Sequence, residues 1–247
     1  MKLVLLGTGG YYANDRRHTA CLMLPEIGVA LDAGSGMFRL RDYLATDRLD
    51  IFLSHVHLDH TLGLTYLLDM LPPDALAATV VHGEADKLSA VREHLFNAAI
   101  FPVPPSFQFA PLVATSCALP AGGTLKHFPL AHPGGSIGFR LDWPKSSMAY
   151  VTDTIAKPDA AYIEHIRGVK LLVHEAYFAD DAGNMPELTG HSRLLDVARL
   201  AASAQVEQLI FVHLNPQLVR DDDLNLDEAR RIFPNTRLGT DRMEIDL

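Results

Sequence analysis

The sequence lacks a long uninterrupted hydrophobic run. Its longest apolar stretch, residues 62–81, is broken by two aspartates and two prolines, so it falls short of the ~20 apolar residues that a membrane-spanning helix needs. The first ten residues, MKLVLLGTGG, hold too short an apolar segment for the core of a signal peptide. We therefore expect no membrane partner and a cytoplasmic location.

Cysteine and positive charge are also scarce. The two cysteines, Cys21 and Cys117, lie in separate apolar segments with no CxxC spacing, which predicts two buried free thiols. Acidic residues outnumber basic residues by 30 to 21, for a formal net charge of −9. That charge repels an extended phosphate backbone and argues against binding of long nucleic acids. A small anionic substrate held by a metal is compatible with it.

The composition that is present suits one compact domain. Of the 247 residues, 48% are hydrophobic and 21% are charged, which excludes disordered, collagen-like and disulfide-stapled proteins. No internal repeat, charge run or low-complexity linker divides the chain, so we predict a single domain over residues 1–247. Histidine is in excess, with 12 copies, and in an acidic chain this excess points to metal binding.

The hydrophobic patterning predicts an α/β protein. Apolar runs between turn signals predict strands at 2–6, 19–24, 27–31, 51–53, 79–81, 125–130, 137–142, 148–152, 169–173 and 208–212. Helical spacing predicts helices at 35–44, from 59 to the proline at 72, and at 85–96, 159–166, 192–204 and 226–232. Strands with helices interspersed in both halves fit two stacked sheets with helices outside.

A proline-rich aromatic segment, FPVPPSFQFAP at residues 101–111, interrupts this pattern. Its phenylalanines, Phe101, Phe107 and Phe109, are expected to present apolar surface that a monomer rarely leaves in water. We predict that residues 95–111 dock on a second copy of the chain, as a two-fold homodimer, or cap the functional site. The alternative is a loop packed on the protein's own core.

Residues 54–60, Ser-His-Val-His-Leu-Asp-His, carry the strongest functional signal in the chain. They follow a predicted strand and precede a predicted helix. His55 and His57 are two residues apart, so in extended backbone both imidazoles leave the same face, as two ligands of one ion must. Asp59 and His60 add two donors at the helix start. Four donors within six residues exceed what one tetrahedral site uses, and two adjacent ions are predicted.

Three further donors each follow an apolar strand, in PLAHPGG, MAYVTDT and LIFVHLN. They are His132, Asp153 and His213, and their shared position at strand ends predicts one common rim. Asp153 is the predicted bridge, because a carboxylate binds two cations through its two oxygens. We assign His55, His57 and His132 to one ion. Asp59, His60 and His213 are assigned to the other.

Two other polar residues near this motif are weighed as supporting groups. Asp32 follows a buried strand within a glycine-flanked turn, LDAGSG. It is read either as a partner that orients a ligating imidazole or as an ordinary turn residue. His174 is expected to pack or hydrogen-bond rather than to ligate.

The pattern HVHLDH followed by His132, Asp153 and His213 resembles that of the metallo-β-lactamase-fold hydrolases, over nearly the whole chain. The opening LLGTGG, LDAGSG, HEA at Glu175 and GHS at His191 are similar to the ribonuclease Z and phosphodiesterase branch. The resemblance implies a four-layer αβ/βα sandwich. It also implies that Asp59 is both a ligand and a base toward the nucleophilic water. Glu175 and His191 are implied to act as a coupled catalytic pair near the leaving group.

One departure from that branch concerns the substrate. A long arm that grips transfer RNA lies between the third-motif histidine and the bridging aspartate in typical bacterial ribonuclease Z, whereas only 21 positions separate His132 from Asp153 here. Together with the net charge of −9, the missing arm favours a small or cyclic phosphodiester, or a short RNA.

We therefore predict a metal-dependent hydrolase, a phosphodiesterase that uses two divalent ions and a metal-bridging hydroxide. Zinc is favoured, with manganese or iron as alternatives. Other functions remain open at this stage: a thioesterase or lactonase on the same fold, ribonuclease Z-like processing of transfer RNA, or a non-enzymatic binding protein that kept the site.

Overall fold

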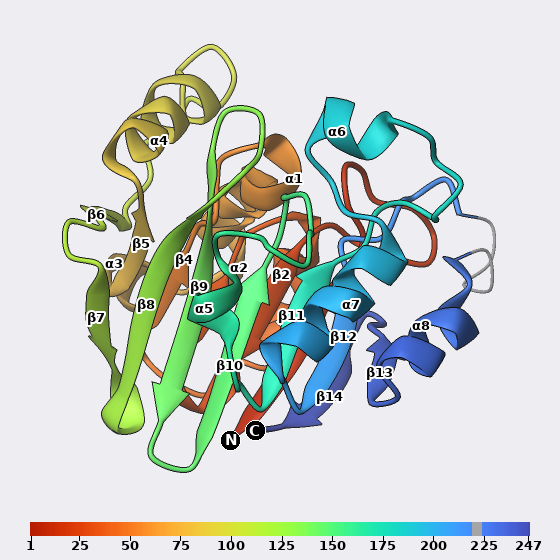
Figure 1. Ribbon diagram of the computed structural model, residues 1–247. Coiled ribbons are helices and arrows are strands. Elements are labelled where there is room, and N and C mark those ends of the chain that lie inside the picture. Colours follow the sequence, from red (N-terminus) through yellow and green to blue (C-terminus); the bar gives the residue numbers. More distant parts are fainter. Residues whose placement is uncertain (219–223) are drawn as a thin grey trace. The chain divides into compact units, whose positions relative to one another are not determined.

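The computed structural model describes residues 1–218 and 224–247. The chain divides into two compact units, each built around one sheet (Figure 1). Unit 1 consists of residues 1–8, 12–114 and 241–246, and unit 2 consists of residues 9–11, 115–240 and 247. The prediction of a single domain over residues 1–247 stays a prediction.

Unit 1 contains a seven-stranded mixed sheet in the order β14-β1-β2-β3-β4-β5-β6. The strands are β1 Lys2–Gly7, β2 Cys21–Leu24, β3 Val29–Leu31, β4 Leu49–Phe52, β5 Thr79–Gly83, β6 Gln108–Pro111 and β14 Met243–Asp246. The pairs from β3 to β6 are parallel, and the pairs from β14 to β3 are antiparallel. The predicted hairpin is confirmed as β2 and β3, which the 3₁₀ turn η1 Pro25–Ile27 connects. Strands β6 and β14 were not predicted.

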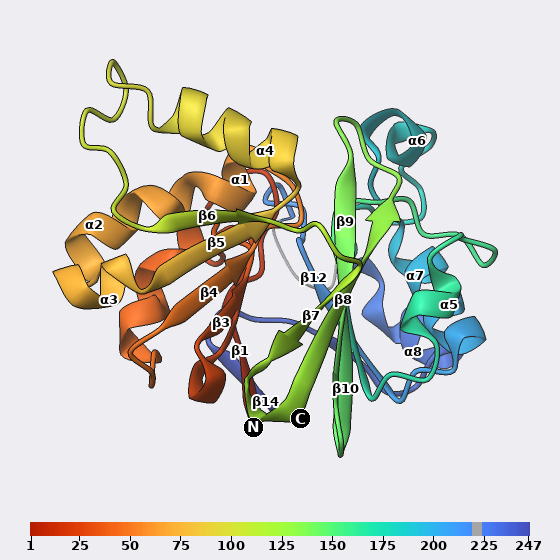
Figure 2. The same cartoon turned by 90° about the vertical axis from the view of Figure 1, so that its left-hand side faces the viewer.

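The helices of unit 1 lie on one face of its sheet (Figure 2). They are η2 Ser35–Asp42, α1 Leu58–Thr61, η3 Leu62–Tyr66, α2 Leu67–Met70, α3 Pro73–Ala77, α4 Ala85–Ala90 and the π-helical turn η4 Val91–Leu95. The continuous helix predicted from residue 59 to 72 is wrong, because the Gly63 amide bonds to the Ala33 carbonyl rather than along the helix. The segment predicted as a helix at 35–44 is a 3₁₀ helix.

The apolar surface expected from three phenylalanines is also wrong. Phe107 is buried, and Phe101 and Phe109 are partly buried against the core of unit 1. The rings of Phe96, Phe107 and Phe109 follow one another at centroid distances of 5.7 and 5.3 Å. The segment packs on its own core, where β6, which carries Phe109, pairs with β5.

Unit 2 contains a second seven-stranded mixed sheet, in the order β13-β12-β11-β10-β9-β8-β7. Its strands are β7 Ser116–Leu119, β8 Gly123–Leu130, β9 Ser136–Trp143, β10 Ser146–Val151, β11 Leu171–Glu175, β12 Gln208–Val212 and β13 Thr236–Leu238. The pairs from β7 to β10 are antiparallel, and the pairs from β10 to β13 are parallel. Five of these strands were predicted, and the edge strands β7 and β13 were not.

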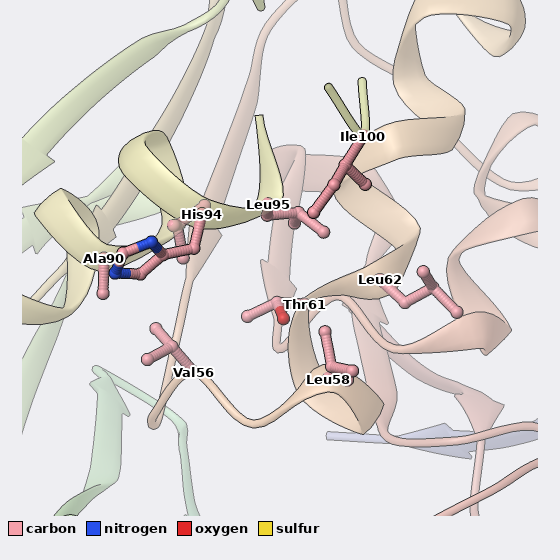
Figure 3. Close-up of a pocket in the computed structure, with 9 residues that line it drawn as sticks. Val56, Leu58, Thr61, Leu62, Ala90, His94, Leu95 and Ile100 are labelled. Atoms are coloured by element: carbon pink, nitrogen blue, oxygen red, sulfur yellow. The ribbon is translucent and has the colours of Figure 1, made fainter. Parts of the chain in front are cut away.

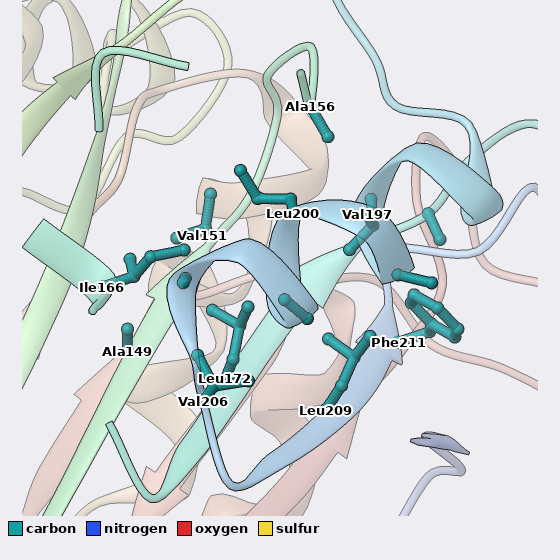
Figure 4. Close-up of a cluster of buried hydrophobic side chains, with 14 of the residues drawn as sticks. Ala149, Val151, Ala156, Ile166, Leu172, Val197, Leu200, Val206, Leu209 and Phe211 are labelled. Carbon is teal, nitrogen blue, oxygen red and sulfur yellow. The ribbon is translucent and has the colours of Figure 1, made fainter. Parts of the chain in front are cut away.

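Helix α7, Leu194–Ala204, supplies most of the helical side of this unit's core. Its apolar positions Leu194, Val197, Ala198 and Ala201 recur at helical spacing and are fully buried. Val197 and Leu200 belong to one buried cluster with Leu172, Leu209 and Phe211 of the sheet (Figure 4). The shorter helices of unit 2 are α5 Ile163–Ile166, α6 Met185–Thr189 and α8 Leu226–Ile232, so only the last turn of the helix predicted at 159–166 forms.

The predictions about membrane spans and about the cysteines have different outcomes. Within the described residues, no helix is both long and apolar enough to cross a bilayer, and the cytoplasmic location stays a prediction. Both cysteines are free thiols, as predicted, but only Cys21 is buried, and burial raises the pKa of its thiol. Cys117 is partly exposed because it lies on the edge strand β7.

Candidate functional site

Unit 1 brings the histidines of the SHVHLDH segment together at the end of β4. The rings of His55 and His57 have centroids 4.5 Å apart, as the two-residue spacing predicts, and the rings of His55 and His60 have centroids 4.2 Å apart. His57 is extended at the start of α1, and Asp59 and His60 lie in its single turn. The end of β4 and the single turn of α1 therefore bring three imidazoles together.

Asp32 orients two of these imidazoles. Its Oδ2 accepts a hydrogen bond from His60 Nδ1 at 2.8 Å, and its two oxygens accept the amide and the hydroxyl of Ser54 at 2.7 and 2.8 Å. Ser54 Oγ, having donated its hydrogen, accepts from His55 Nδ1 at 3.1 Å. Both imidazoles thus carry their hydrogen on Nδ1, which leaves Nε2 as the ligand atom. Of the two readings of Asp32, the orienting one fits these contacts.

Asp59 and His60 have the separation of two ligands of one ion. Asp59 Oδ2 lies 3.4 Å from His60 Nε2, and two atoms bound to one tetrahedral zinc at about 2.0 to 2.2 Å lie roughly 3.4 Å apart. Because His60 Nδ1 already donates to Asp32, the neutral ring presents a lone pair at Nε2 to a carboxylate oxygen. Such a pair is stabilised by a cation placed between its atoms.

In unit 2, Asp153 faces two imidazoles with its two oxygens. Its Oδ1 lies 3.3 Å from His213 Nε2, and its Oδ2 lies 3.6 Å from His132 Nε2. The three residues follow β12, β10 and β8, so the structure brings together the strand-end donors that the sequence predicts. The two oxygens face two different imidazoles, which is the arrangement that a bridging carboxylate requires.

The tautomer of His132 is determined by a backbone carbonyl. His132 Nδ1 lies 3.0 Å from the carbonyl oxygen of Gly190, and because a carbonyl only accepts, Nδ1 carries the hydrogen. The neutral ring then turns its Nε2 lone pair toward Asp153 Oδ2. Two acceptors facing each other at 3.6 Å repel unless a cation lies between them. The donor set of unit 2 therefore fits a divalent ion.

Backbone strain accompanies three of these positions. Asp32, Asp153 and His213 have φ angles of +59°, +46° and +52°, in the left-handed region that costs about 1 kcal/mol or more for a residue with a Cβ. Each follows a strand, and the turn of the backbone aims the side chain along the strand end. Gly10 makes room for one of them, because a Cβ there would lie 2.5 Å from the His213 ring.

Glu175 and His191, which the resemblance implies to be a coupled pair, contact each other. Glu175 is the last residue of β11 and is fully buried, and its Oε1 accepts from the Thr154 amide at 2.8 Å and lies 3.2 Å from His191 Nδ1. Its Oε2 is buried with no hydrogen-bond partner among the described residues. A carboxylate accepts the Nδ1 hydrogen, so His191 Nε2 points away from Glu175.

His191 also has the position of a candidate ligand. One ligand atom from each of Asp153, His191 and His213 lies within 4.8 Å of the others, and the His191 ring centroid is 5.1 Å from that of His132. The metal content of a variant that lacks His191 therefore distinguishes a metal ligand from a proton donor. His191 is partly exposed, whereas Asp153 and His213 are buried.

His174 lies apart from these donors, as predicted. Its Nδ1 donates to the carbonyl of Glu175 at 2.8 Å, and its Nε2 accepts from the Tyr162 hydroxyl at 2.9 Å. Burial lowers the pKa of His174 to about 4. Burial also raises the pKa of Tyr162, and the charge of Glu175 raises it further. Both ring nitrogens are satisfied, so His174 is a neutral core residue.

Ser192 Oγ supports the site by donating to the Thr154 carbonyl at 2.7 Å and accepting from the Ala156 amide at 2.9 Å. Sequence reasoning missed three other supporting residues. Ser54 links Asp32 to His55, and Thr152 Oγ1 donates to Asp153 Oδ1 at 2.6 Å. The third is Tyr177, whose ring packs on His191. The available signal was local, since each residue lies within two positions of a predicted site residue.

A family model described as "Beta-lactamase superfamily domain" matches residues 29–214. The chain belongs to this superfamily. Ribonuclease Z of Prochlorococcus marinus (strain NATL1A) is 42% identical over 110 residues, which cover 42% of this chain and 34% of that protein. In that match the chain spans about a third of the relative's length. Ribonuclease Z of Methanosarcina acetivorans is 24% identical over 301 positions, which cover 100% of this chain and 98% of that protein.

Solved structures agree with this membership at the level of the fold. The metallo-β-lactamase fold protein YhfI from Bacillus subtilis has a TM-score of 0.81 at 17% identity, over 99% of each chain. A diphosphatase of the PhnP family has a TM-score of 0.72 at 20% identity, over 100% of this chain and 97% of that one. The predicted α/β class and metallo-β-lactamase fold are confirmed.

Proposed function

We propose that this chain is a metal-dependent hydrolase, specifically a phosphodiesterase that works with two divalent metal ions, zinc being the favoured element. In this proposal His55, His57 and His132 serve one ion, and Asp59, His60 and His213 serve the other. Asp153 serves both. The observation that carries it is the pair of contacts made by Asp153, whose two oxygens face the Nε2 atoms of two different imidazoles at 3.3 and 3.6 Å.

The donor chemistry supports zinc. Five imidazoles and two carboxylates form a nitrogen-rich set, which suits zinc, whereas magnesium and calcium prefer oxygen ligands. When bound, a pair of such dications lowers the pKa of a coordinated water from 15.7 toward about 7 and stabilises negative charge on a phosphoryl group. The set is also compatible with manganese or iron, which a metal analysis of the purified protein distinguishes.

The protein's own side chains would move the protons. Asp59 carries a carboxylate oxygen that can accept a proton from the attacking water, in addition to its role as a ligand. His191, with Nδ1 turned to Glu175 at 3.2 Å, would deliver a proton from Nε2, on the opposite side of its ring, to the leaving alkoxide. The buried carboxylate of Glu175 holds the imidazole and stabilises its protonated form.

Three observations support a small or cyclic phosphodiester or a short RNA as the substrate. The relatives named above are ribonucleases, and one structural neighbour is a diphosphatase. The alignment with the Methanosarcina protein runs over 301 positions against 247 residues here, so at least 54 of its positions have no counterpart in this chain. The net charge of −9 disfavours an extended nucleic acid.

Hydrolysis of bis(p-nitrophenyl) phosphate tests this proposal. We expect protein purified in unchelated buffer to contain metal and to turn this substrate over. Chelation should abolish turnover, and zinc or manganese should restore it. A cyclic nucleotide, a short RNA, a precursor transfer RNA, a thioester and a lactone complete the panel. Turnover of the thioester or lactone alone would overturn the phosphodiesterase assignment, and so would metallated protein that is inert on every substrate.

Processing of transfer RNA is the second candidate, favoured by the ribonuclease Z relatives. The match to Prochlorococcus ribonuclease Z reaches 42% identity, although only over 110 residues. Precursor transfer RNA cut at a single position, at a rate above that on a cyclic nucleotide, would support this candidate over the first.

We also propose that a second copy of the chain docks on unit 1. A cavity of about 460 Å³ is lined by apolar side chains, with Thr61 and His94 as its polar lining residues (Figure 3). Leu58, Leu62 and Ile100 border it and are 67%, 40% and 72% exposed. The lining offers an anionic substrate no lysine or arginine and is mostly apolar, so apolar side chains of a second copy are the fitting occupant. In a two-fold dimer, one symmetric interface would bury the cavities of both copies.

A further inference from the structure

Tyr177 lies flat against the imidazole of the proposed general acid. Its ring centroid is 4.9 Å from that of His191, with an angle of 22° between the planes. We propose that Tyr177 is a positioning residue, which holds the His191 ring in the orientation that directs Nε2 toward the leaving group. This inference rests on the phosphodiesterase function proposed above, in which His191 donates that proton.

The hydrogen bond to Glu175 cannot orient His191 by itself. The contact of 3.2 Å at Nδ1 restrains one atom of the ring, and rotation of the side chain about χ1 and χ2 moves the opposite edge. Nε2 lies on the far side of the ring, so a modest swing displaces it by a large part of an ångström. A flat neighbour on the ring face removes this freedom, because rotation would drive the imidazole edge into the aromatic carbons.

Two further contacts close the ring in. The centroids of His191 and His213 are 5.3 Å apart at 22°, and those of Tyr177 and His213 are 5.9 Å apart at 43°. The three rings thus form a triangle, with Tyr177 as its only member that is not a histidine. His191 therefore has an aromatic ring and a candidate metal ligand as two of its neighbours.

The backbone holds Tyr177 in this place. The next residue, Phe178, forms a parallel bridge with Arg193, in which the Phe178 amide donates to the Ser192 carbonyl and the Leu194 amide donates to the Phe178 carbonyl. This pairing fixes the segment after β11 beside the segment that carries His191. The contact between Tyr177 and His191 is therefore built into the pairing of two backbone segments.

The first test is a series of aryl and alkyl phosphodiesters whose leaving groups range from p-nitrophenolate to a simple alkoxide. Replacing Tyr177 with Ala should lower kcat on the alkoxide substrate by about tenfold, since misplacement by about 1 Å costs up to ~100-fold. The rate on p-nitrophenolate, which leaves without a proton, should stay within twofold. Tyr177→Phe keeps the flat ring and should retain the wild-type dependence on leaving group. Equal losses on both substrates, or a failure of Phe to rescue, would overturn the proposal.

A double-mutant cycle with His191→Ala separates positioning from general damage. If Tyr177 acts through His191, then Tyr177→Ala should cause no further loss on the alkoxide substrate once His191 is absent. Independent, multiplicative losses would contradict the inference. Tyr177→Leu fills a similar volume without a flat face and serves where the alanine variant folds poorly. Phe233→Ala removes a partly buried aromatic elsewhere in unit 2 and is the matched control.

A measurement that does not depend on enzymatic activity tests the contact between Tyr177 and His191. In protein with carbon-13-labelled histidine, the ring resonances of His191, assigned from His191→Ala, should shift on Tyr177→Ala by loss of the aromatic ring current. They should keep their positions in Tyr177→Phe and Phe233→Ala. Unchanged His191 resonances in Tyr177→Ala would refute the contact. Protein that lacks phosphodiesterase activity but shows the shift would remove the proposed function and leave the packing intact.

Discussion

His60 donates its Nδ1 hydrogen to Oδ2 of the buried Asp32 over 2.8 Å. The same carboxylate accepts two hydrogen bonds from Ser54, which in turn accepts from His55. One aspartate outside the ligand motif thereby sets the tautomers of two predicted ligands. Its positive φ of +59° is a local cost that these hydrogen bonds offset.

Asp32→Asn should weaken metal binding without unfolding the protein. An amide offers one acceptor oxygen to three donors, so at least one imidazole loses its orientation, and we expect a 10- to 100-fold loss of zinc affinity. Competition with a chromophoric chelator measures this loss. Asp50→Asn is the matched control, because Asp50 also bonds a histidine, His82, at 2.8 Å in the same unit. Equal zinc affinity in both variants would contradict the role of Asp32.

Replacing Asp153 with Ala should remove both ions together. The carboxylate is the proposed shared ligand, whereas His132→Ala should chiefly weaken one ion. Metal content of the purified variants, measured by mass spectrometry, compares the two. Asp142→Ala, which removes an aspartate bonded to Arg140, should retain full metal content. Full occupancy in Asp153→Ala would refute the bridge.

His191→Ala should retain the metal and slow only substrates with poor leaving groups. A general acid contributes about 10²- to 10⁴-fold where the leaving oxygen needs a proton, and p-nitrophenolate hardly needs one. The ratio of kcat on an alkyl and a p-nitrophenyl diester is the measurement. Loss of metal from this variant would instead identify His191 as a metal ligand. Its position beside Asp153 and His213 is compatible with that role.

His174 should make the protein less stable in acid. Burial lowers its pKa from 6.5 to about 4. Between these two pH values, His174 is protonated in the unfolded state and neutral in the folded state. The free energy of unfolding therefore drops as the pH falls from 6.5 toward 4, by about 2 to 3 kcal/mol between pH 7 and 4.5. Urea unfolding of metal-free wild type and His174→Gln should show this difference, and parallel pH curves would argue against it.

A charged residue at the unit 1 cavity should split the proposed homodimer. Ile100 is 72% exposed and Leu62 is 40% exposed, so the double change to Asp places charge at the contact with little effect on the core. Light scattering should give ~54 kDa for wild type, twice the chain mass of 27.1 kDa, and one chain mass for the variant. Val113→Asp, at a 92% exposed side chain, is the control. A wild-type monomer would eliminate the interface.

Much of the architecture was predictable because it depends on local patterning. The buried strands β1, β4, β10 and β12 are apolar runs between turn signals, and α7 repeats its apolar residues at helical spacing. The edge strands β6, β7, β13 and β14 were missed because an edge strand carries little apolar alternation. The helix after His57 was predicted as continuous because spacing does not report the bond from Gly63 to Ala33.

The sequence by itself determined which donors are present and where along the chain they occur. His55 and His57 share a face because backbone alternation has a period of two, and His132, Asp153 and His213 follow strands whose ends meet within one sheet. Which nitrogen of His60 and of His132 carries the hydrogen is set by tertiary contacts. That choice depends on acceptors distant in sequence, Asp32 for His60 and Gly190 for His132. Tertiary structure also places Tyr177 against His191, because the pairing of Phe178 with Arg193 holds those two segments together.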